Sequence, residues 1–338
     1  MMNSKVTLKD VAKSANVDPS TVSRHLNGKK TFDIETVERI ELAVKELGYR
    51  PNRIGKILRQ GRSKLIGVVV PDITHQNYAL AIESIQHACR KEGLGMLLFT
   101  TGYDYEEEKS ALRQLIDLNV DGVILNLASH SVHRHQAWWP EQLPKVLLFN
   151  DGELEGLPSI ALNNRQAMLS LTEHLIERGH QNIAMIGSDF TRVHRYKMRA
   201  EGYREAMQKA GLAEQIQIEE TQLGLEDLSS VLCRILSVKH RPTAIISSHA
   251  QLLIKLHGEL NQMEYRIPQD ISLAGFNLYE MGKLLSPTIC TVDQSISQIG
   301  EQTLALLKQQ IDGEASSERY YVSSDFSYGQ SIKVLQPS

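Results

Sequence analysis

Residues 7–28 read TLKDVAKSANVDPSTVSRHLNG, and this stretch predicts two short helices joined by a tight turn. Thr7 is suited to cap the first helix, because an acidic residue follows three positions later and completes a capping box. Asn16 tolerates the left-handed backbone of a tight turn. Asp18 and Pro19 then supply the N-cap and the first-turn proline of a second helix. The stretch is therefore typical of a helix-turn-helix.

Apolar residues recur at helical spacing here and in the residues that follow. A third helix is predicted to begin after the N-cap Asp33 and to end at Gly48. The three apolar stripes consist of Leu8, Val11, Ala12 and Ala15, of Val22 and Leu26, and of Ile34, Val37, Ile40, Val44 and Leu47. An ordinary three-helix bundle with solvated polar faces accounts for this spacing. The alternative is a DNA-binding domain whose second helix presents polar side chains to a major groove.

Charge is distributed unevenly along the chain. Residues 1–62 contain 13 Lys and Arg against 7 Asp and Glu, a net charge of +6, whereas the remaining residues contain 24 against 33, a net charge of −9. A basic segment attached to a larger acidic one favours a polyanionic partner for the basic segment alone. This balance is compatible with nucleic acid but does not by itself decide between the two interpretations.

The stretch 7–28, together with TVERIELAVKELGYRPN at 36–52, closely resembles the headpiece of the lactose-repressor (LacI/GalR) family of bacterial transcription regulators. The resemblance favours the DNA-binding interpretation and implies a homodimer on double-stranded, pseudo-palindromic operator DNA. It implies base contacts by Pro19, Ser20 and Arg24, and contacts to the DNA backbone by Thr7, Ser23, Asn27 and Thr36. Arg24 is the expected guanine reader, because its two-donor fork matches the O6 and N7 acceptors.

Residues 49–61, YRPNRIGKILRQG, are too short to form a stable helix in isolation. In the resembled family this segment folds as a hinge helix when two copies enter the minor groove at the operator centre. The resemblance puts Leu58 at the position that wedges into a base step, and Arg53 and Arg59 near phosphates or the groove. Gly55 stands where relatives usually have alanine, which costs about 0.5 to 1 kcal/mol of helix per chain. In the free protein we expect a flexible linker here.

From residue 64 onward, short apolar runs of β type alternate with helix-length amphipathic stretches, as in LIGVVV (65–70) and GVILNL (122–127). This alternation predicts a parallel sheet covered by helices. The pattern starts afresh with NIAMIG at 182–187, so a second doubly wound unit follows the first. The predicted fold class is α/β, with two doubly wound parallel-sheet lobes preceded by a small all-α helix-turn-helix headpiece. Ligands bind at the carboxyl ends of such strands, so two facing lobes predict a hinged cleft.

The family resemblance continues over nearly the full length, for example in HLIERGHQNIAMIGS (174–188) and IPQDISLAGF (267–276), and the lobes resemble the sugar-binding proteins of the periplasm. It implies a headpiece at 1–48, a hinge at 49–63 and an effector-binding and dimerisation domain at 64–338, with lobe 1 formed by 64–162 and 293–322 and lobe 2 by 163–292 and 323–338. No heptad repeat follows residue 325, so we expect a dimer rather than a tetramer.

The expected effector site departs from the family pattern. Relatives that bind neutral sugars usually place an arginine on the second lobe with carboxylates nearby, and Arg199 fills the arginine position. His249 and Ala250 stand where relatives usually have an Asn-Asp pair, and Asn277 stands where they have a later aspartate, so two negative charges are missing. The preceding segment holds four basic residues, Arg192, His194, Arg195 and Lys197. This balance favours an anionic effector such as a sugar phosphate or a sugar acid. The alternative is that these charges lie on a solvated helix face.

The resemblance adds Asn77, Tyr78 and Asn150 as effector contacts from the first lobe, with Tyr78 as a candidate stacking surface. It implies a repressor of a carbohydrate-metabolism operon, controlled by a small-molecule effector. A neutral sugar or nucleoside-type ligand, or a protein partner, is the alternative to an anion. The sequence leaves open whether the effector loosens or tightens DNA binding.

The sequence contains no GxSxG, Walker loop, HExxH or CxxC motif, so we expect neither an enzyme nor a cofactor. Three histidines, His130, His133 and His135, lie close together, but their spacing favours no single helical or strand face. We therefore expect a surface segment there rather than a metal site. There is no apolar leader and no run of about 18 apolar residues, which predicts a cytoplasmic protein without a membrane partner.

Overall fold

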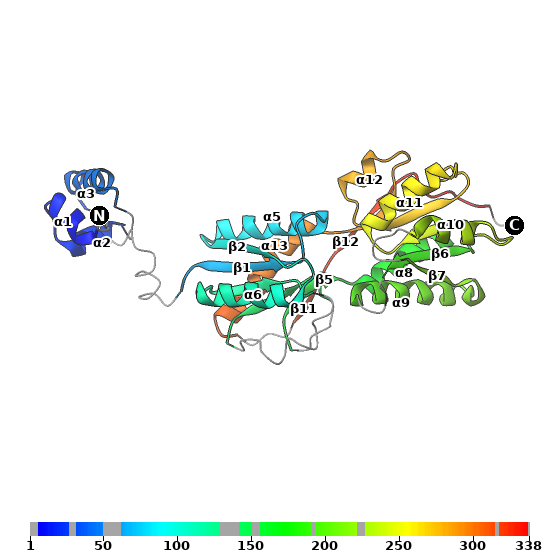
Figure 1. Ribbon diagram of the computed structural model, residues 1–338, viewed down its shortest axis with the longest axis horizontal. Coiled ribbons are helices and arrows are strands. Elements are labelled where there is room, and N and C mark those ends of the chain that lie inside the picture. The colour runs from blue at the N-terminus through cyan, green and yellow to red at the C-terminus, as the bar shows by residue number, and fades with distance from the viewer. Residues whose placement is uncertain are drawn as a thin grey trace. The chain divides into compact units, whose positions relative to one another are not determined.

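The computed structural model describes residues 6–26, 32–49, 62–128, 142–150, 156–188, 190, 193–221, 227–314 and 318–336. The chain forms two compact units, Met1–Ser63 and Lys64–Ser338. The smaller unit is helical and the larger one is α/β (Figure 1). The predicted fold class is confirmed.

The headpiece contains helices α1 (Leu8–Ser14), α2 (Pro19–Leu26) and α3 (Ile34–Leu47). The Thr7 capping box forms as predicted, with Thr7 N donating to Asp10 Oδ2 at 2.8 Å. Asn16 has a φ of 52°, and Gly48 ends α3 with a φ of 62°. These local signals set the ends of the helices, as the sequence predicts.

Val11, Ala12, Ala15, Val22, Ile40 and Ala43 are the buried residues of the headpiece core. One apolar prediction was wrong, because Ile34 is 78% exposed. Ile34 is the first residue of α3, and the contribution of α3 to the headpiece core begins only at Ile40. The helical spacing of Ile34 is correct, but the first turn of α3, where it lies, is outside the headpiece core.

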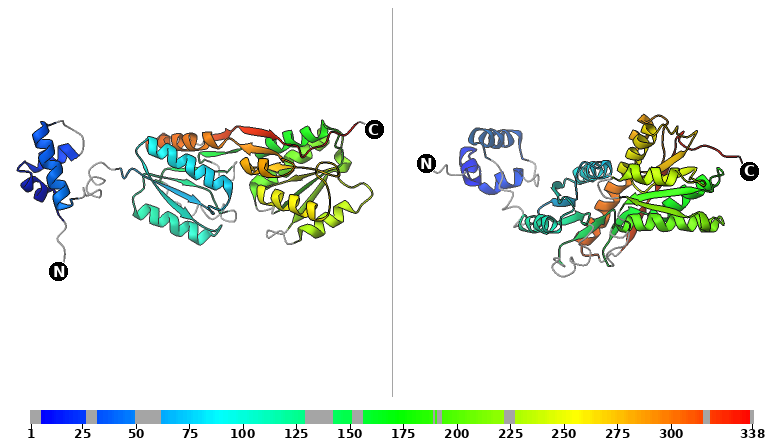
Figure 2. Two further views of the ribbon diagram at one scale, coloured as in Figure 1. Left: turned by 90° about the horizontal axis from the view of Figure 1, so that it is seen from above. Right: turned by 45° about the vertical axis from the view of Figure 1, so that its right-hand side comes forward.

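The larger unit contains two six-stranded sheets, each with its own covering helices (Figures 1 and 2). The strands of the first, in spatial order, are β11 (Arg319–Val322), β5 (Ser159–Leu162), β4 (Lys145–Leu148), β3 (Gly122–Leu125), β1 (Leu65–Val70) and β2 (Gly95–Thr100). Those of the second are β12 (Ser324–Tyr328), β10 (Cys290–Gln294), β9 (Ser272–Phe276), β8 (Ala244–Ser247), β6 (Ile183–Ser188) and β7 (Gln217–Thr221). All pairings are parallel except that between β10 and β12. We refer to these halves as the first and second lobes.

Alternation along each strand divides the core of a lobe between the two faces of its sheet. In the first lobe, Ile66 and Val68 of β1 pack with helices α5 (Gln76–Lys91) and α13 (Ile296–Ile311), which lie side by side in Figure 2. Val69 points to the other face and packs with α6 (Tyr105–Asp117).

The second lobe follows the same rule. Met185 of β6 packs with α8 (Asn164–Ile176) and α9 (His194–Lys209), whereas Ile186 packs with α10 (Leu228–Leu236) and α11 (Ala250–Gln262). The short helices η1 (Ala213–Gln215) and α12 (Glu280–Leu284) complete the lobe.

Candidate DNA interface and effector site

The second headpiece helix presents the predicted base-reading residues to solvent. Pro19 begins α2, and the Asp18 carboxylate accepts a hydrogen bond from the backbone N–H of Ser20 at 2.8 Å. Val22 is fully buried, which fixes the rotation of the helix about its axis. Pro19, Ser20 and Arg24 are all exposed on α2. The geometry is that of a helix whose outer face is available to a partner.

Of the residues predicted to contact the DNA backbone, Thr7 and Thr36 lie at or near helix N-termini. The Thr7 hydroxyl donates to Asp10 Oδ2 at 2.7 Å, and Thr36 Oγ1 accepts from Arg39 Nη2 at 3.2 Å. Ser23 is half-buried on α2. Helix N-termini favour phosphate groups, because several backbone N–H groups there lack helical partners. The other predicted DNA contacts, Asn27, Arg53, Gly55, Leu58 and Arg59, lie outside the described residues.

In the first lobe, Tyr78 is held rigidly near the start of α5. It is 5% exposed, and its hydroxyl donates to Asn126 Oδ1 at 3.1 Å. Asn126 in turn donates from Nδ2 to the carbonyl of Leu148 at 2.7 Å. The Tyr78 ring packs against that of Phe149 with a centroid distance of 5.8 Å. This tyrosine is therefore a fixed wall, with less free surface than a stacking platform would need.

The two predicted asparagines of the first lobe differ in exposure. Asn77 is half-buried on α5, whereas Asn150 is buried just after β4. Both follow strands of the first sheet, where the carboxyl ends of parallel strands present polar groups to a ligand.

In the second lobe, Arg199 of α9 is 2% exposed and anchored on several sides. Its Nε donates to Asn164 Oδ1 at 2.8 Å, and its Nη1 donates to the carbonyl of Ser248. Its guanidinium carbon lies 3.9 Å from the ring centroid of Phe276, within the range of a cation–π contact. The surroundings fix a positive charge at the carboxyl ends of the second sheet.

His249 caps α11 and is uncharged. Its Nδ1 accepts from the backbone N–H of Leu252 at 3.3 Å, and its Nε2 lies 3.1 Å from Ser188 Oγ. The imidazole stacks on Tyr196 with a centroid distance of 5.2 Å. Burial, together with the charge of Arg199, lowers the pKa of His249 to about 3. The imidazole therefore stays neutral at physiological pH.

Asn277 is buried and supports the backbone. Its φ is 60°, and its Oδ1 accepts from the backbone N–H of Gln294 at 3.3 Å. Gln294 ends β10, where the chain leaves the second lobe for α13 of the first. The side-chain amide of Asn277 thus stabilises the backbone at one of the points where the chain passes from one lobe to the other.

The segments that follow the strands of the two lobes approach one another. Arg195 of α9 interacts electrostatically with Tyr78 and Tyr103 of the first lobe. Burial disfavours its charge, but the phenols of Tyr196, Tyr78 and Tyr103 raise the pKa of Arg195, which stays charged. We call the group so formed the interlobe cluster: His75, Tyr78 and Tyr103 of the first lobe, and Arg195, Tyr196, Arg199 and His249 of the second.

The basic segment before Arg199 does not act as one surface. Arg195 and Arg199 are four residues apart, so they share a face of α9 that turns toward the cluster. Lys197 is exposed, His194 is half-buried, and Arg192 lies outside the described residues.

Several polar residues of this region were not predicted from the sequence. Asn126, Asn164 and Ser188 hold predicted residues in place, and each lies at or just after the end of a strand. Position after an apolar run was the signal that could have found them. Ser248 Oγ and Thr101 Oγ1 are also buried at strand ends, and they have no hydrogen-bond partner among the described residues.

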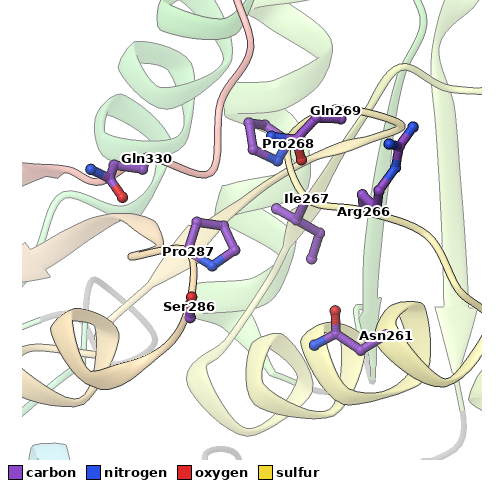
Figure 3. A pocket seen from close by; sticks show the side chains of 8 residues that line it. All are labelled: Asn261, Arg266, Ile267, Pro268, Gln269, Ser286, Pro287 and Gln330. Atoms are coloured by element: carbon purple, nitrogen blue, oxygen red, sulfur yellow. The ribbon is translucent and has the colours of Figure 1, made fainter.

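A separate hollow of about 550 Å³ lies where the chain enters β9 and β10 (Figure 3). It is lined by Asn261, Arg266, Ile267, Pro268, Gln269, Ser286, Pro287 and Gln330. Arg266 is held by Asp270, with Nε 2.8 Å from Oδ2. This hollow is at the amino ends of the strands, opposite the ends where parallel sheets bind ligands.

The described residues contain no group of three or more histidine, cysteine or acidic side chains placed to hold a metal ion. The stretch with His130, His133 and His135 lies outside them. Among the described residues, no helix combines the length and apolar character needed to cross a membrane.

Comparison with known proteins identifies both units. Residues 7–52 match the model for bacterial regulatory proteins of the lacI family, and residues 172–332 match the periplasmic binding protein-like domain. The chain is 27% identical over 322 residues to the transcriptional repressor PurR of Vibrio atlanticus (strain LGP32), covering 93% of this chain and 95% of the relative. The chain thus combines a LacI-family DNA-binding domain with a periplasmic binding protein-like domain, and its relatives are transcription regulators of the LacI type.

Other relatives and solved structures agree with this family. The regulator KdgR of Bacillus subtilis (strain 168) is 28% identical over 313 residues, covering 91% of this chain and 92% of the relative. The lac repressor dimer bound to operator and the anti-inducer ONPF shares the fold, with a TM-score of 0.83, 23% identity and coverage of 97% and 99%. A CelR–cellobiose complex gives a TM-score of 0.69 at 24% identity, covering 96% and 99%. With its LacI-type headpiece and these regulator relatives, the chain is a DNA-binding transcription regulator, and the relatives are regulators rather than enzymes.

Proposed function

We propose that this regulator binds a pseudo-palindromic operator as a homodimer, represses a carbohydrate-metabolism operon and responds to a small molecule bound at the interlobe cluster. The observation that carries the DNA-binding part is α2, which buries Val22 and exposes Pro19, Ser20 and Arg24. Thr7, Ser23 and Thr36 are proposed phosphate contacts that fix the register of the helix on DNA.

Replacement of Arg24 tests the assignment of α2. Arg24→Ala removes a bidentate donor to guanine, which is worth about 1 to 3 kcal/mol per half-site, while salt-sensitive binding to any DNA should persist. Fluorescence anisotropy with DNA from upstream of the gene itself, against random DNA, measures the ratio of the two affinities. Lys13→Ala is the matched control, because Lys13 carries the same charge as Arg24 and is exposed on α1. A protein with Arg24→Ala that discriminated as the parent does would refute the proposal.

An anionic effector, such as a sugar phosphate or sugar acid, is the ligand that the charges of the cluster favour. Arg195 and Arg199 are both charged there, and His249 is neutral. Ala250 and Asn277 stand at the expected carboxylate positions. Anions bind well where cationic donors are fixed. Asp72, an acid beside the cluster, lies on the first-lobe side, with its Oδ2 3.6 Å from His75 Nε2. Asn77, Tyr78 and Asn150 are the proposed contacts from the first lobe.

Calorimetric titration with neutral sugars, nucleosides, sugar phosphates and sugar acids tests the ligand class. Each hit is then added to the operator complex to find whether it loosens or tightens binding. Tighter binding of neutral sugars or nucleosides than of their charged counterparts would favour the alternative ligands. A protein partner becomes the favoured alternative if no small molecule changes operator affinity.

Dimerisation is supported by exposed apolar side chains on the second lobe. Leu284 and Met281 of α12, with Ile254 of α11, are all exposed, and Leu284 is 84% exposed. The two helices are adjacent in Figure 1, and His257 of α11 lies within hydrogen-bond distance of the Ser286 carbonyl just after α12. Exposed apolar groups gain free energy when a second copy covers them.

We therefore expect Leu284→Asp to dissociate the dimer, as measured by sedimentation equilibrium. Val334→Asp is the control, because Val334 is also exposed and apolar but belongs to the C-terminal segment. If both variants sediment as the parent does, α12 is not part of the interface.

A further inference from the structure

Helix α12 is too short to hold its own position. It has five residues, Glu280–Leu284, and no side chain of the described residues caps its N-terminus. Isolated helices shorter than about 12 residues are marginal in water, so contacts with the rest of the lobe must fix α12. One such contact is within the helix, where the carbonyl of Gly282 accepts from the backbone N–H of Ile289 at 3.1 Å. The other lies at its start.

The start of α12 is held by the carboxylate of Asp293, which lies near the end of β10 and is 8% exposed. Its Oδ1 accepts from the backbone N–H of Tyr279 at 3.3 Å, and its Oδ2 accepts from the Thr291 hydroxyl at 3.1 Å. The backbone N–H of Leu278 also donates to this carboxylate. Successive backbone N–H groups that turn toward one anion form a concave binding arrangement. Here the anion is a side chain of the same lobe.

The loop 277–279 has a backbone conformation that needs this support. Asn277 and Tyr279 have positive φ values of 60° and 48°. For a bulky residue such as tyrosine this is a genuine outlier, which persists only where the surroundings enforce it. Leu278, between them, is buried in the core of the lobe. The Asp293 carboxylate and the core together fix the loop, and the first residue of α12 follows it directly.

The charge of Asp293 strengthens this attachment. Burial raises the pKa of the Asp293 carboxyl, and the hydrogen bonds from Tyr279, Thr291 and Leu278 oppose the rise. Hydrogen bonds to an ionised acceptor are stronger than those between neutral groups. Exposed Met281 and Leu284 of α12 belong to the proposed dimer contact. A segment that is ordered before association loses less conformational entropy on binding.

We propose that Asp293 is a positioning residue of the dimer, whose carboxylate orders the loop 277–279 and so presents α12, already folded, to a second copy of this chain. The inference rests on the proposed dimer contact and adds the group that prepares it. Asn277, a proposed effector contact, belongs to the same loop, so one carboxylate holds residues of both proposed sites.

Fluorescence-detected sedimentation velocity of the full-length protein, diluted from micromolar to picomolar, measures the dimer Kd. Asp293→Ala should raise this Kd about 10- to 100-fold, because strong hydrogen bonds to a charged group are lost and α12 must be ordered on association. Asp293→Asn keeps one acceptor oxygen without the charge, so its Kd should lie between those of the parent and Asp293→Ala. An unchanged Kd in Asp293→Ala overturns the proposal.

Asp104→Ala is the matched control for general loss of stability. Asp104 also accepts from two backbone N–H groups, those of Glu106 and Glu107 at 2.7 and 3.0 Å, but it caps α6 in the first lobe. It should lower the free energy of unfolding in urea and leave the dimer Kd unchanged. If Asp104→Ala and Asp293→Ala weaken the dimer equally, the effect of Asp293 is not specific to α12 and the proposal is overturned.

Hydrogen exchange gives a test that leaves Asp293 and α12 unaltered. Ile254→Asp, on α11, changes the proposed contact from outside α12 and should give a monomer. The amides of residues 277–285 should stay protected in this monomer, as in the parent dimer. Exchange at the rate of an unstructured peptide would show that the second copy orders α12, which overturns the proposal. If neither Ile254→Asp nor Leu284→Asp dissociates the dimer, the proposed dimer contact itself is wrong.

Discussion

Asn16 holds a left-handed backbone conformation at the turn between α1 and α2, with a φ of 52°. A residue with a Cβ pays about 1 to 2 kcal/mol in this region, from which asparagine is partly exempt and glycine fully exempt. Asn16→Ala should destabilise the headpiece by about 1 kcal/mol, whereas Asn16→Gly should be neutral or stabilising. Hydrogen exchange of headpiece amides in the full-length chain measures the difference. Equal exchange in the two variants would show that the turn does not need this conformation.

A single residue, His249, also makes the free energy of unfolding depend on pH. Its pKa is about 3 in the folded chain and about 6.5 when unfolded. Above pH 6.5 both states are neutral; as the pH falls below 6.5 only the unfolded state binds the proton, so stability is lost down to about pH 3. From pH 7 to pH 5 the loss amounts to about 2 kcal/mol. Urea unfolding at the two pH values should show a smaller loss in His249→Asn, and an equal loss would contradict the assigned protonation state.

The ends of the headpiece helices were predictable from the sequence, because capping and turn residues next to them set those ends. Asn16, Asp18 with Pro19, and Gly48 act within one turn of the backbone, so their residue types were sufficient to place helix ends. The apolar runs likewise placed the strands, because a buried parallel strand needs apolar side chains on both faces.

The hydrogen bonds that hold the side chains of the candidate site in place could not be predicted in the same way. The bond from Tyr78 to Asn126 joins residues 48 positions apart, and the bond from Arg199 to Asn164 spans 35. Such pairs form only because a sheet brings distant strand ends together, and no local pattern specifies them. Tyr78 therefore looked like a free stacking surface in the sequence, although the structure buries it.

Helix packing around α9 depends on one glycine. A Cβ at Gly202 would overlap the carbonyl oxygen of Arg165, so α9 and α8 approach closely only because position 202 lacks a side chain. Gly202→Ala should cost about 1 to 3 kcal/mol by overpacking and should weaken effector binding, because α9 carries Arg195 and Arg199. Gly258→Ala on α11 is the control. It meets no atom within 4 Å and should stabilise by about 0.5 to 1 kcal/mol. Chemical denaturation that moved both variants equally would refute the packing argument.

At the scale of the molecule, the larger unit is tied together by its chain path. The backbone passes between lobes near residues 163, 295 and 323, because α13 and β11 return to the first lobe before β12 rejoins the second. Ser295 N donates to the carbonyl of Ser323 at 3.0 Å, which joins two of these crossings. Neither lobe is a continuous segment, so we expect the lobes to lose their structure together.

Calorimetric unfolding of the full-length protein should therefore show two transitions, one for each compact unit. An effector bound at the interlobe cluster stabilises only the folded larger unit, by about 2.7 kcal/mol at a ligand concentration of 100 Kd. It should raise the transition of the larger unit and leave that of the headpiece unchanged, whereas operator DNA should raise that of the headpiece. Three transitions would mean that the lobes unfold separately despite the three crossings. A headpiece transition that rose with effector in the absence of DNA would place the ligand on the smaller unit instead.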